Sequence, residues 1–175
     1  MELPTLRDDD LVLRPKHPRD ADAITAACQD PEIPRWTLVP SPYTRAHAEE
    51  FIAAGEAEAA AGTAFSLLAV DAADDRLLGS FSVMELARAP RYGEIGYWVA
   101  ARERGRGIAP RAVRLLTGWA RSELGLNRIE ILAHRDNAPS RRVAEKAGYR
   151  DSGELRACPR GDPDEMVYAV YVADD

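Results

Sequence analysis

The segment Arg102-Glu-Arg-Gly105-Arg-Gly107-Ile-Ala109 lies between an alternating stretch, Gly93-Glu-Ile-Gly-Tyr-Trp-Val99, and a stretch with helical periodicity. We call residues Arg102–Ala109 the glycine loop. Its glycines let the backbone turn sharply and approach a ligand closely. The free N–H groups and the dipole of the following helix favour an anion at this position. Positive charge that can screen a pyrophosphate comes from Arg102, Arg104, Arg106 and Arg111.

The glycine loop belongs to the first of two strand–loop–helix units. Side chains alternate in its strand, so one face carries Glu94, Gly96 and Trp98 and the other carries Ile95, Tyr97 and Val99. The helix after the loop has apolar or small residues every three to four positions, at Pro110, Val113, Leu116, Ala120 and Leu124, and ends near Gly125. The second unit joins a strand, Arg128–His134, to a helix, Pro139–Ala147, with Asn137 and Ser140 at its turn.

Antiparallel strands are predicted before the glycine loop. Leu11–Pro15 is a short strand, and Asp20 is expected to cap a helix that runs to Cys28. Thr63–Val70 and Arg76–Leu86 form a hairpin around the turn 71–75, and Gly93–Val99 extends it into a meander.

Three further segments complete the predicted elements. Prolines at positions 31, 34, 40 and 42 indicate an irregular loop that carries Trp36 and Tyr43, and Thr44 can cap a second helix that stops near Gly62. Tyr149–Arg156 and Met166–Val172 are the last strands, the second apolar on both faces like an interior strand. The elements predict an α+β fold with a mixed sheet of about six or seven strands and about four helices.

Composition limits the class of protein. A chain of 175 residues fits one domain, residues 1–175, and 46% hydrophobic with 30% charged residues is typical of a globular protein. A net charge of -6 argues against nucleic acid, and no stretch approaches the ~20 apolar residues of a membrane span. Cys28 and Cys158 have no metal-ligand spacing, so we expect no metal and a cytoplasmic protein.

Two common phosphate-binding motifs are excluded by spacing. The glycine loop lacks the Lys-Ser or Lys-Thr ending of a P-loop, and it lacks the three-glycine pattern and downstream acid of a dinucleotide fold. ATP and NAD are therefore disfavoured as ligands.

Two motifs resemble the GNAT superfamily of acetyl-CoA-dependent N-acetyltransferases. Gly93–Val99 with the glycine loop is similar to the central strand and coenzyme A loop of the family, and Asn137-Ala-Pro-Ser-Arg-Arg-Val-Ala-Glu-Lys-Ala-Gly-Tyr149 is similar to its second cofactor segment. Leu11–Pro15 with Asp20 and the loop from Asp30 resemble the branch of ribosomal-protein N-terminal acetyltransferases. The resemblance covers nearly the whole chain and implies a splayed parallel strand pair in the centre of the sheet.

The resemblance also implies the site. Acetyl-CoA would be the cosubstrate, held by Trp98, Val99, Arg104, Gly105, Arg106, Gly107, Ile108, Ala109, Asn137 and Ser140. A backbone N–H near Val99 would polarise the thioester, and Ser140 would donate a hydrogen bond to the departing thiolate. An amine must lose a proton before it attacks, and Glu94 is the first candidate base, with His134 second and a water path as the alternative.

The acceptor and several flanking residues stay open at this stage. Trp36 and Tyr97, with Tyr43, are candidates to line the acceptor side, Lys146 can reach a phosphate, and residues 156–165 are expected to form a rim that includes Arg156 and Arg160. The acceptor would be a small-molecule or peptide amine, one example being a protein N-terminus. The alternatives are a noncatalytic coenzyme A-binding module and an acyltransferase for another donor such as succinyl-CoA. Either a monomer or a homodimer is expected.

Overall fold

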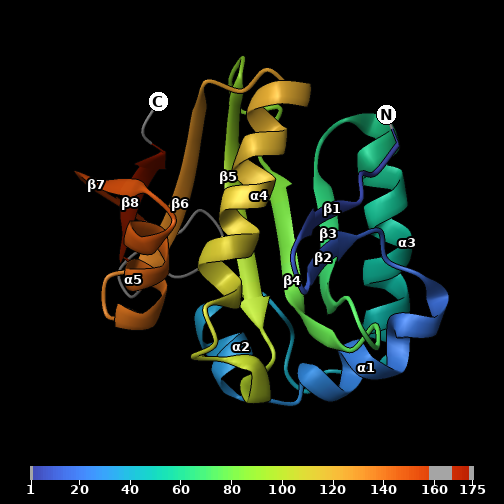
Figure 1. The fold of residues 1–175 in the computed structure, drawn as a ribbon. Coiled ribbons are helices and arrows are strands. Elements are labelled where there is room, and N and C mark those ends of the chain that lie inside the picture. The colour runs from blue at the N-terminus through green and yellow to red at the C-terminus, as the bar shows by residue number, and fades with distance from the viewer. Residues whose placement is uncertain (1, 158–166, 174–175) are drawn as a thin grey trace.

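The computed structural model describes residues 2–157 and 167–173. Its centre is an eight-stranded sheet with the order β1-β2-β3-β4-β5-β6-β8-β7 (Figure 1). Neighbouring strands are antiparallel except β5 and β6, which are parallel. The strands are β1 (Leu6–Asp8), β2 (Leu11–Arg14), β3 (Phe65–Asp71), β4 (Leu77–Met84), β5 (Tyr92–Val99), β6 (Arg128–His134), β7 (Tyr149–Ala157) and β8 (Val167–Ala173).

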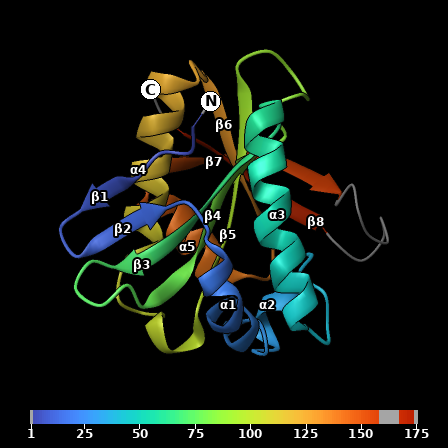
Figure 2. The same ribbon diagram turned by 90° about the vertical axis from the view of Figure 1, so that its right-hand side faces the viewer.

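Helices cover both faces of the sheet. They are α1 (Ala21–Ala27), α2 (Glu32–Trp36), α3 (Arg45–Ala61), α4 (Ile108–Glu123) and α5 (Ala138–Lys146). Figure 2 shows α4 and α3 on opposite sides of the sheet. The α4 side encloses the larger core, around Leu116, Ile129 and Ile131, and the α1 and α3 side encloses a smaller one around Ile24 and Leu68. Within the described residues, no helix is long and apolar enough to cross a membrane.

The mixed fold predicted from the sequence is confirmed, and most predicted elements agree with the structure to within two residues. The interior position of the C-terminal strand is also confirmed, because β8 lies between β6 and β7. Two short elements were missed. Strand β1 has three residues in a polar stretch, and α2 has five in the proline-rich segment that was expected to be irregular. Prolines 31 and 34 are compatible with α2 because one precedes the helix and the other lies in its first turn, where N–H groups need no helical partner.

The expected capping role of Asp20 is wrong. Its side chain makes no capping bond to α1, and its carboxylate instead accepts hydrogen bonds from Arg14 Nη1 and Nη2 at 2.9 and 2.8 Å and from the His17 N–H at 2.7 Å. Asp20 ends a preceding 3₁₀ turn in a helical conformation, so its side chain turns back toward β2. Arg14 and Asp20 are both more than nine-tenths buried, and this pair attaches the start of α1 to the sheet.

We expect Asp20→Ala to lower the free energy of unfolding by about 2–4 kcal/mol, because the buried Arg14 guanidinium loses its buried carboxylate partner. Burial alone would raise the pKa of Asp20, but the Arg14 and His17 bonds outweigh it and lower the pKa, so this stability is lost as the pH falls through that pKa. Urea unfolding measures both effects. The control is Asp75→Ala, which removes the more exposed partner of Arg14 and should cost at most about 1 kcal/mol. Equal losses in the two variants would contradict the role of Asp20.

Candidate active site

The parallel strands β5 and β6 separate partway along their length. Their pairing covers only Tyr92 with Arg128, Gly93 with Ile129 and Glu94 with Glu130. Beyond Glu94, β5 stays paired to β4 as far as Val99, and β6 stays paired to β8. A wedge therefore opens between the two strands, as expected from the sequence resemblance.

Backbone groups of β5 face this wedge. The Ala100 N–H donates to the Leu78 carbonyl at 2.9 Å, so the backbone N–H of Ala100 points toward β4. In an antiparallel pair, the N–H and C=O of successive residues point to opposite sides of the strand. Val99 and Tyr97 therefore direct their N–H groups away from β4 and into the wedge, where an extended ligand can add like a further strand.

The glycine loop lies at the open end of the wedge, directly before α4. Gly105 and Gly107 have φ angles of 78° and 75°, a left-handed conformation that favours glycine, and the space beside each Cα is open. Gly107 is the N-cap of the 16-residue helix α4 and offers no side-chain cap, so the first N–H groups of that helix remain available for an anion. This geometry fits a pyrophosphate.

Most arginines near the glycine loop are already engaged by protein groups. Arg106 pairs with Glu103, and Arg111 binds Asp8 and Asp10 at 2.8 Å. Arg104 donates from Nε to the Val99 carbonyl at 3.1 Å, and its Nη2 lies 2.5 Å from Asp30 Oδ2. The anion site therefore depends chiefly on backbone N–H groups of the loop and helix.

A single cavity of about 1000 Å³ includes the glycine loop, the wedge and the opposite face of β5. Of the residues that the sequence resemblance assigned to the cofactor, all line this cavity except Arg106, and those that do are Trp98, Val99, Arg104, Gly105, Gly107, Ile108, Ala109, Asn137 and Ser140. Sequence reasoning missed Arg142, which also lines the cavity. Arg142 and Lys146 lie four residues apart on α5, and this spacing, which puts two side chains on one helical face, was a readable signal.

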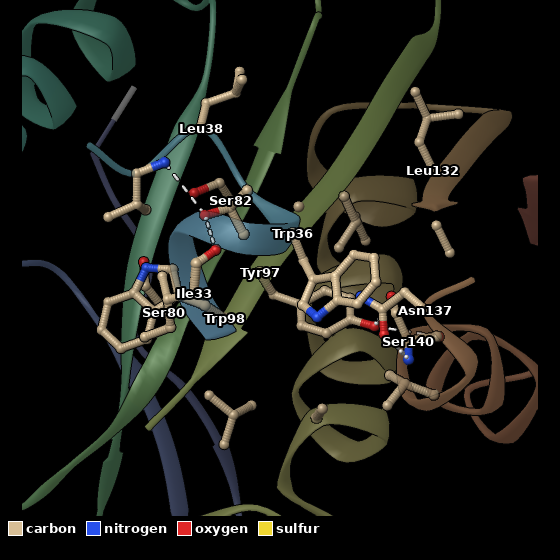
Figure 3. Close-up of a pocket in the computed structure, with 18 of the residues that line it drawn as sticks. Ile33, Trp36, Leu38, Ser80, Ser82, Tyr97, Trp98, Leu132, Asn137 and Ser140 are labelled. Atoms are coloured by element: carbon tan, nitrogen blue, oxygen red, sulfur yellow. Dashed lines mark hydrogen bonds between the residues drawn. The ribbon is translucent and has the colours of Figure 1, made fainter. Parts of the chain in front are cut away.

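A hydroxyl pair spans the wedge. Tyr97 Oη lies 2.9 Å from Ser140 Oγ, and either oxygen can be the donor. Asn137 caps α5, because its side-chain oxygen accepts from the Ser140 N–H at 3.1 Å. Figure 3 shows Tyr97, Asn137 and Ser140 together on one side of the cavity. Burial raises the pKa of Tyr97 to about 12, so its hydroxyl keeps its proton at neutral pH.

Two neighbouring carboxylates at the last paired position of β5 and β6, where the wedge begins, differ in their partners. Glu130 is fully buried and accepts hydrogen bonds from the Tyr92 hydroxyl, Arg128 and Arg156, each at 2.7 Å. Glu94, which pairs with Glu130 across β5 and β6, is half-buried and lines the cavity, and its side chain accepts no hydrogen bond from any described residue. Burial, with the nearby charge of Glu85, raises the pKa of Glu94 to about 7. Glu94 is therefore poised to exchange a proton near neutral pH, whereas the Glu130 carboxylate is held in its charged form.

His134 is less suited to accept a proton. Its Nδ1 accepts a hydrogen bond from the Asp136 N–H at 3.2 Å, which assigns the proton of the neutral ring to Nε2. The ring packs between Trp36 and Tyr168, with centroid separations of 5.3 and 5.7 Å. As a base, His134 would have to give up its bond to Asp136, so the geometry favours Glu94.

The face of β5 that carries Glu94 and Trp98 is covered by apolar and aromatic side chains from α2, α3 and the intervening segment. Ile33 and Trp36 reach the cavity from α2 (Figure 3), and Tyr43 and Phe51 reach it from the other side. The residues suggested for the acceptor side, Trp36, Tyr97 and Tyr43, thus all line the cavity.

The suggested rim falls mostly outside the described residues. Residues 158–166, which include Arg160, lie there, whereas Arg156 is described and binds Glu130 and Glu154. Among the described residues, no three His, Cys, Asp or Glu side chains group in a way that could hold a metal ion.

A sheet with a splayed parallel pair, a glycine loop at the next helix and a cavity that joins both faces is the arrangement of acyl-coenzyme A-dependent transferases. A family model described as "Acetyltransferase (GNAT) domain" matches residues 10–150. The chain belongs to this GNAT acetyltransferase family.

Known proteins agree with this assignment. YdaF of Bacillus subtilis (strain 168), provisionally named a ribosomal N-acetyltransferase, is 41% identical over 83 residues, which are 47% of this chain and 45% of YdaF. The chain thus matches less than half the length of that relative. A Vibrio cholerae structure provisionally named a ribosomal-protein-serine acetyltransferase has a TM-score of 0.83 at 20% identity and covers 98% of both chains. Mycobacterium smegmatis RimJ, in complex with CoA-disulfide, has a TM-score of 0.82 at 22% identity over 97% of this chain and 85% of RimJ. These two structural similarities support the fold.

Proposed function

We propose that this protein transfers the acetyl group of acetyl-CoA directly to a primary amine. The observation that carries the proposal is the wedge beyond Glu94. It places an anion site at the glycine loop and the Glu94 carboxylate, which accepts no hydrogen bond from the described residues, in one cavity. Acetyl-CoA bound on one side of the sheet can therefore react with an amine bound on the other side.

The geometry of the loop and wedge supports the proposed coenzyme A site. The N–H groups around Gly105, Gly107, Ile108 and Ala109 would hold the pyrophosphate at the start of α4, and Arg142 and Lys146 can add charge from α5. The N–H groups of Tyr97 and Val99 would bind the extended pantetheine arm of coenzyme A. This arm would pass Trp98, Asn137 and Ser140. Acetyl-CoA supplies the thioester whose C–S bond breaks as the new C–N bond forms.

The residues of the chain have separable roles in this transfer. Glu94 accepts the proton that the ammonium of the acceptor must lose before attack, directly or through a water. The Val99 N–H stabilises the negative charge that develops on the carbonyl oxygen. Ser140, oriented by Tyr97, donates a hydrogen bond to the leaving sulfur. No covalent bond to the protein is needed.

The acceptor is proposed to be a protein N-terminal amine. YdaF and the V. cholerae neighbour carry names of ribosomal-protein acetyltransferases, and an N-terminal peptide can reach Glu94 across the face lined by Trp36 and Tyr43. A small-molecule amine and another donor such as succinyl-CoA are the alternatives. We further propose one domain over residues 1–175, a cytoplasmic location without nucleic acid, and a monomer or homodimer.

Calorimetry and a substrate screen test the proposal. We expect acetyl-CoA to bind with a Kd of about micromolar order, and thiol release to appear with peptides that have a free N-terminus. Binding of coenzyme A without thiol release across peptides, polyamines and other amines would indicate a noncatalytic module. Faster release from succinyl-CoA than from acetyl-CoA would indicate the other donor. Absence of acetyl-CoA binding would overturn the proposal.

We expect Ser140→Ala to lower kcat about 10-fold while the Kd for acetyl-CoA changes less than about threefold, because the hydroxyl acts on a charge that exists only as the thiolate leaves. Tyr97→Phe should have a smaller effect on kcat, since it removes only the partner that orients Ser140. The matched control is Ser122→Ala, because the Ser122 hydroxyl donates to a carbonyl of its own helix, α4. A Ser140→Ala variant with weakened binding and normal kcat would assign Ser140 to cofactor binding alone.

A further inference from the structure

Helix α2 covers the acceptor side of the cavity at the open end of the wedge. Ile33 is buried at its base, and the Trp36 ring packs against His134 on β6. In Figure 3 the helix lies in front of the strands, and Trp36 projects toward the side that carries Tyr97 and Ser140. The position of α2 therefore shapes the space that an acceptor must enter.

One side chain connects α2 to the cofactor side. Arg104, in the glycine loop, donates to the Val99 carbonyl at 3.1 Å and places Nη2 2.5 Å from Asp30 Oδ2. Asp30 lies two residues before α2, and its other oxygen accepts from the N–H of Glu32, the first residue of that helix, at 3.2 Å. A continuous set of contacts thus runs from the Val99 peptide through Arg104 and Asp30 to α2.

The connection depends on the contact between Arg104 and Asp30. Asp30 Oδ2 is buried and accepts no directed hydrogen bond from the described residues, so the Arg104 charge alone compensates it. A buried carboxylate oxygen left without its counter-charge is costly, and the segment that carries it would move toward water. Loss of Arg104 should therefore displace the start of α2.

We propose that Arg104 is a positioning residue that couples the cofactor loop to α2 through Asp30, so that an occupied glycine loop favours the acceptor-competent position of α2. This inference rests on the proposed function for the identity of the two ligands, but the contact itself does not. Both ends of the coupling are in the site: the N–H of Val99 faces the wedge, and Trp36 lines the cavity. The rival role for Arg104, the one that the sequence resemblance implied, is direct charge pairing with a phosphate of coenzyme A.

Hydrogen–deuterium exchange tests the coupling without an acceptor. The amides of Ile33, Arg35 and Thr37 donate to the Asp30, Pro31 and Ile33 carbonyls and report on the opening of α2. In the free protein, Arg104→Gln and Asp30→Asn should each speed exchange of these amides about 10-fold. Coenzyme A at saturation should slow their exchange in the wild type and have much less effect on them in either variant, although the glycine loop itself stays protected.

Controls separate this effect from a general loss of an ion pair. Arg45 of α3 pairs with Asp22 of α1, and neither residue lines the cavity. Arg45→Gln and Asp22→Asn remove a more exposed ion pair between two elements and should leave the exchange of α2 and its response to coenzyme A unchanged. Arg104→Lys, which keeps the charge, should restore much of the slow exchange.

Kinetics with the best amine from the screen give a second readout. Arg104→Gln and Asp30→Asn should each raise the acceptor KM about 10-fold and leave the Kd for acetyl-CoA within about threefold. Because the residues act through one contact, the double variant should be no worse than either single variant. Multiplied effects in the double variant would overturn the coupling.

The outcomes distinguish this inference from the proposed function. If Arg104→Gln weakens coenzyme A binding at least about 10-fold and leaves α2 exchange unchanged, Arg104 binds phosphate and the coupling is wrong. If the wild type binds no coenzyme A, the proposed function fails, and the free-protein exchange still tests the Arg104–Asp30 contact. Unchanged α2 exchange in both variants would also overturn the inference.

Discussion

Glu94→Gln is expected to lower kcat by about 10²- to 10⁴-fold, because it removes the proposed proton acceptor and leaves the carbon skeleton of the side chain in place. Glutamine cannot take the proton of an ammonium, so the remaining rate reflects the small fraction of acceptor that is already neutral. Steady-state kinetics with a peptide acceptor measure the change. Acetyl-CoA affinity should stay close to that of the wild type, since Glu94 lies on the opposite face of β5 from Tyr97.

The pH profile gives a sharper test of the same residue. The pKa of Glu94 is raised to about 7, so the wild-type kcat should rise as the pH increases through about 7, where the carboxylate becomes available. Glu94→Gln should lose this step. The comparison variant is Glu130→Gln, which removes the charge that Arg128 and Arg156 compensate and should reduce stability while the step near neutral pH remains. A Glu94→Gln enzyme with wild-type rate and pH profile would exclude this residue as the base.

Stability should change in the opposite direction from activity at Glu94. The folded protein holds the Glu94 proton up to about pH 7, whereas the unfolded chain releases it near the ordinary value of 4.5. The contribution of this group to stability is therefore present below pH 4.5 and is lost as the pH rises to about 7. At pH 8 the glutamine variant avoids this loss and should have the higher Tm, as expected of a site that trades stability for function.

Gly107→Glu is expected to weaken acetyl-CoA binding by at least about 100-fold, because it combines two unfavourable effects. The φ angle of 75° at this N-cap is a left-handed conformation that costs a non-glycine residue about 1–2 kcal/mol. The added carboxylate would also occupy the start of α4, where the proposed site needs the phosphate charge. Calorimetric titration with acetyl-CoA measures the loss.

A matched glycine separates strain from blocked binding. Gly62 ends α3 with a φ angle of 69°, and, like Gly107, it has open space beside its Cα. Gly62→Glu should therefore lower the Tm by a similar backbone effect and leave acetyl-CoA binding unchanged. Gly107→Ala should fall between wild type and Gly107→Glu in affinity. If Gly107→Glu binds acetyl-CoA normally, the glycine loop is not the pyrophosphate site.

The sequence by itself determined the features that depend on near neighbours along the chain. The alternation in Gly93–Val99 placed Glu94 and Tyr97 on opposite faces, and the structure confirms this, with Glu94 beside Met84 and Tyr97 stacked on Phe81. The glycines at 105 and 107 indicated a left-handed turn before a helix, because only a residue without Cβ takes that conformation cheaply. Thr44 was identified as the cap of α3 for a similarly local reason.

Only the tertiary structure decided which groups are partners, because those contacts join residues far apart in the chain. Glu94 and Glu130 both lie in predicted strands, but only the sheet order brings Arg156 to Glu130, whereas no described residue donates to the Glu94 side chain. The arginines of the glycine loop looked equivalent as positive charges, and only packing between distant segments directs Arg104 to Asp30. Local periodicity fixes which face a side chain is on, whereas the folded topology fixes which charge it meets and whether its proton is free to move.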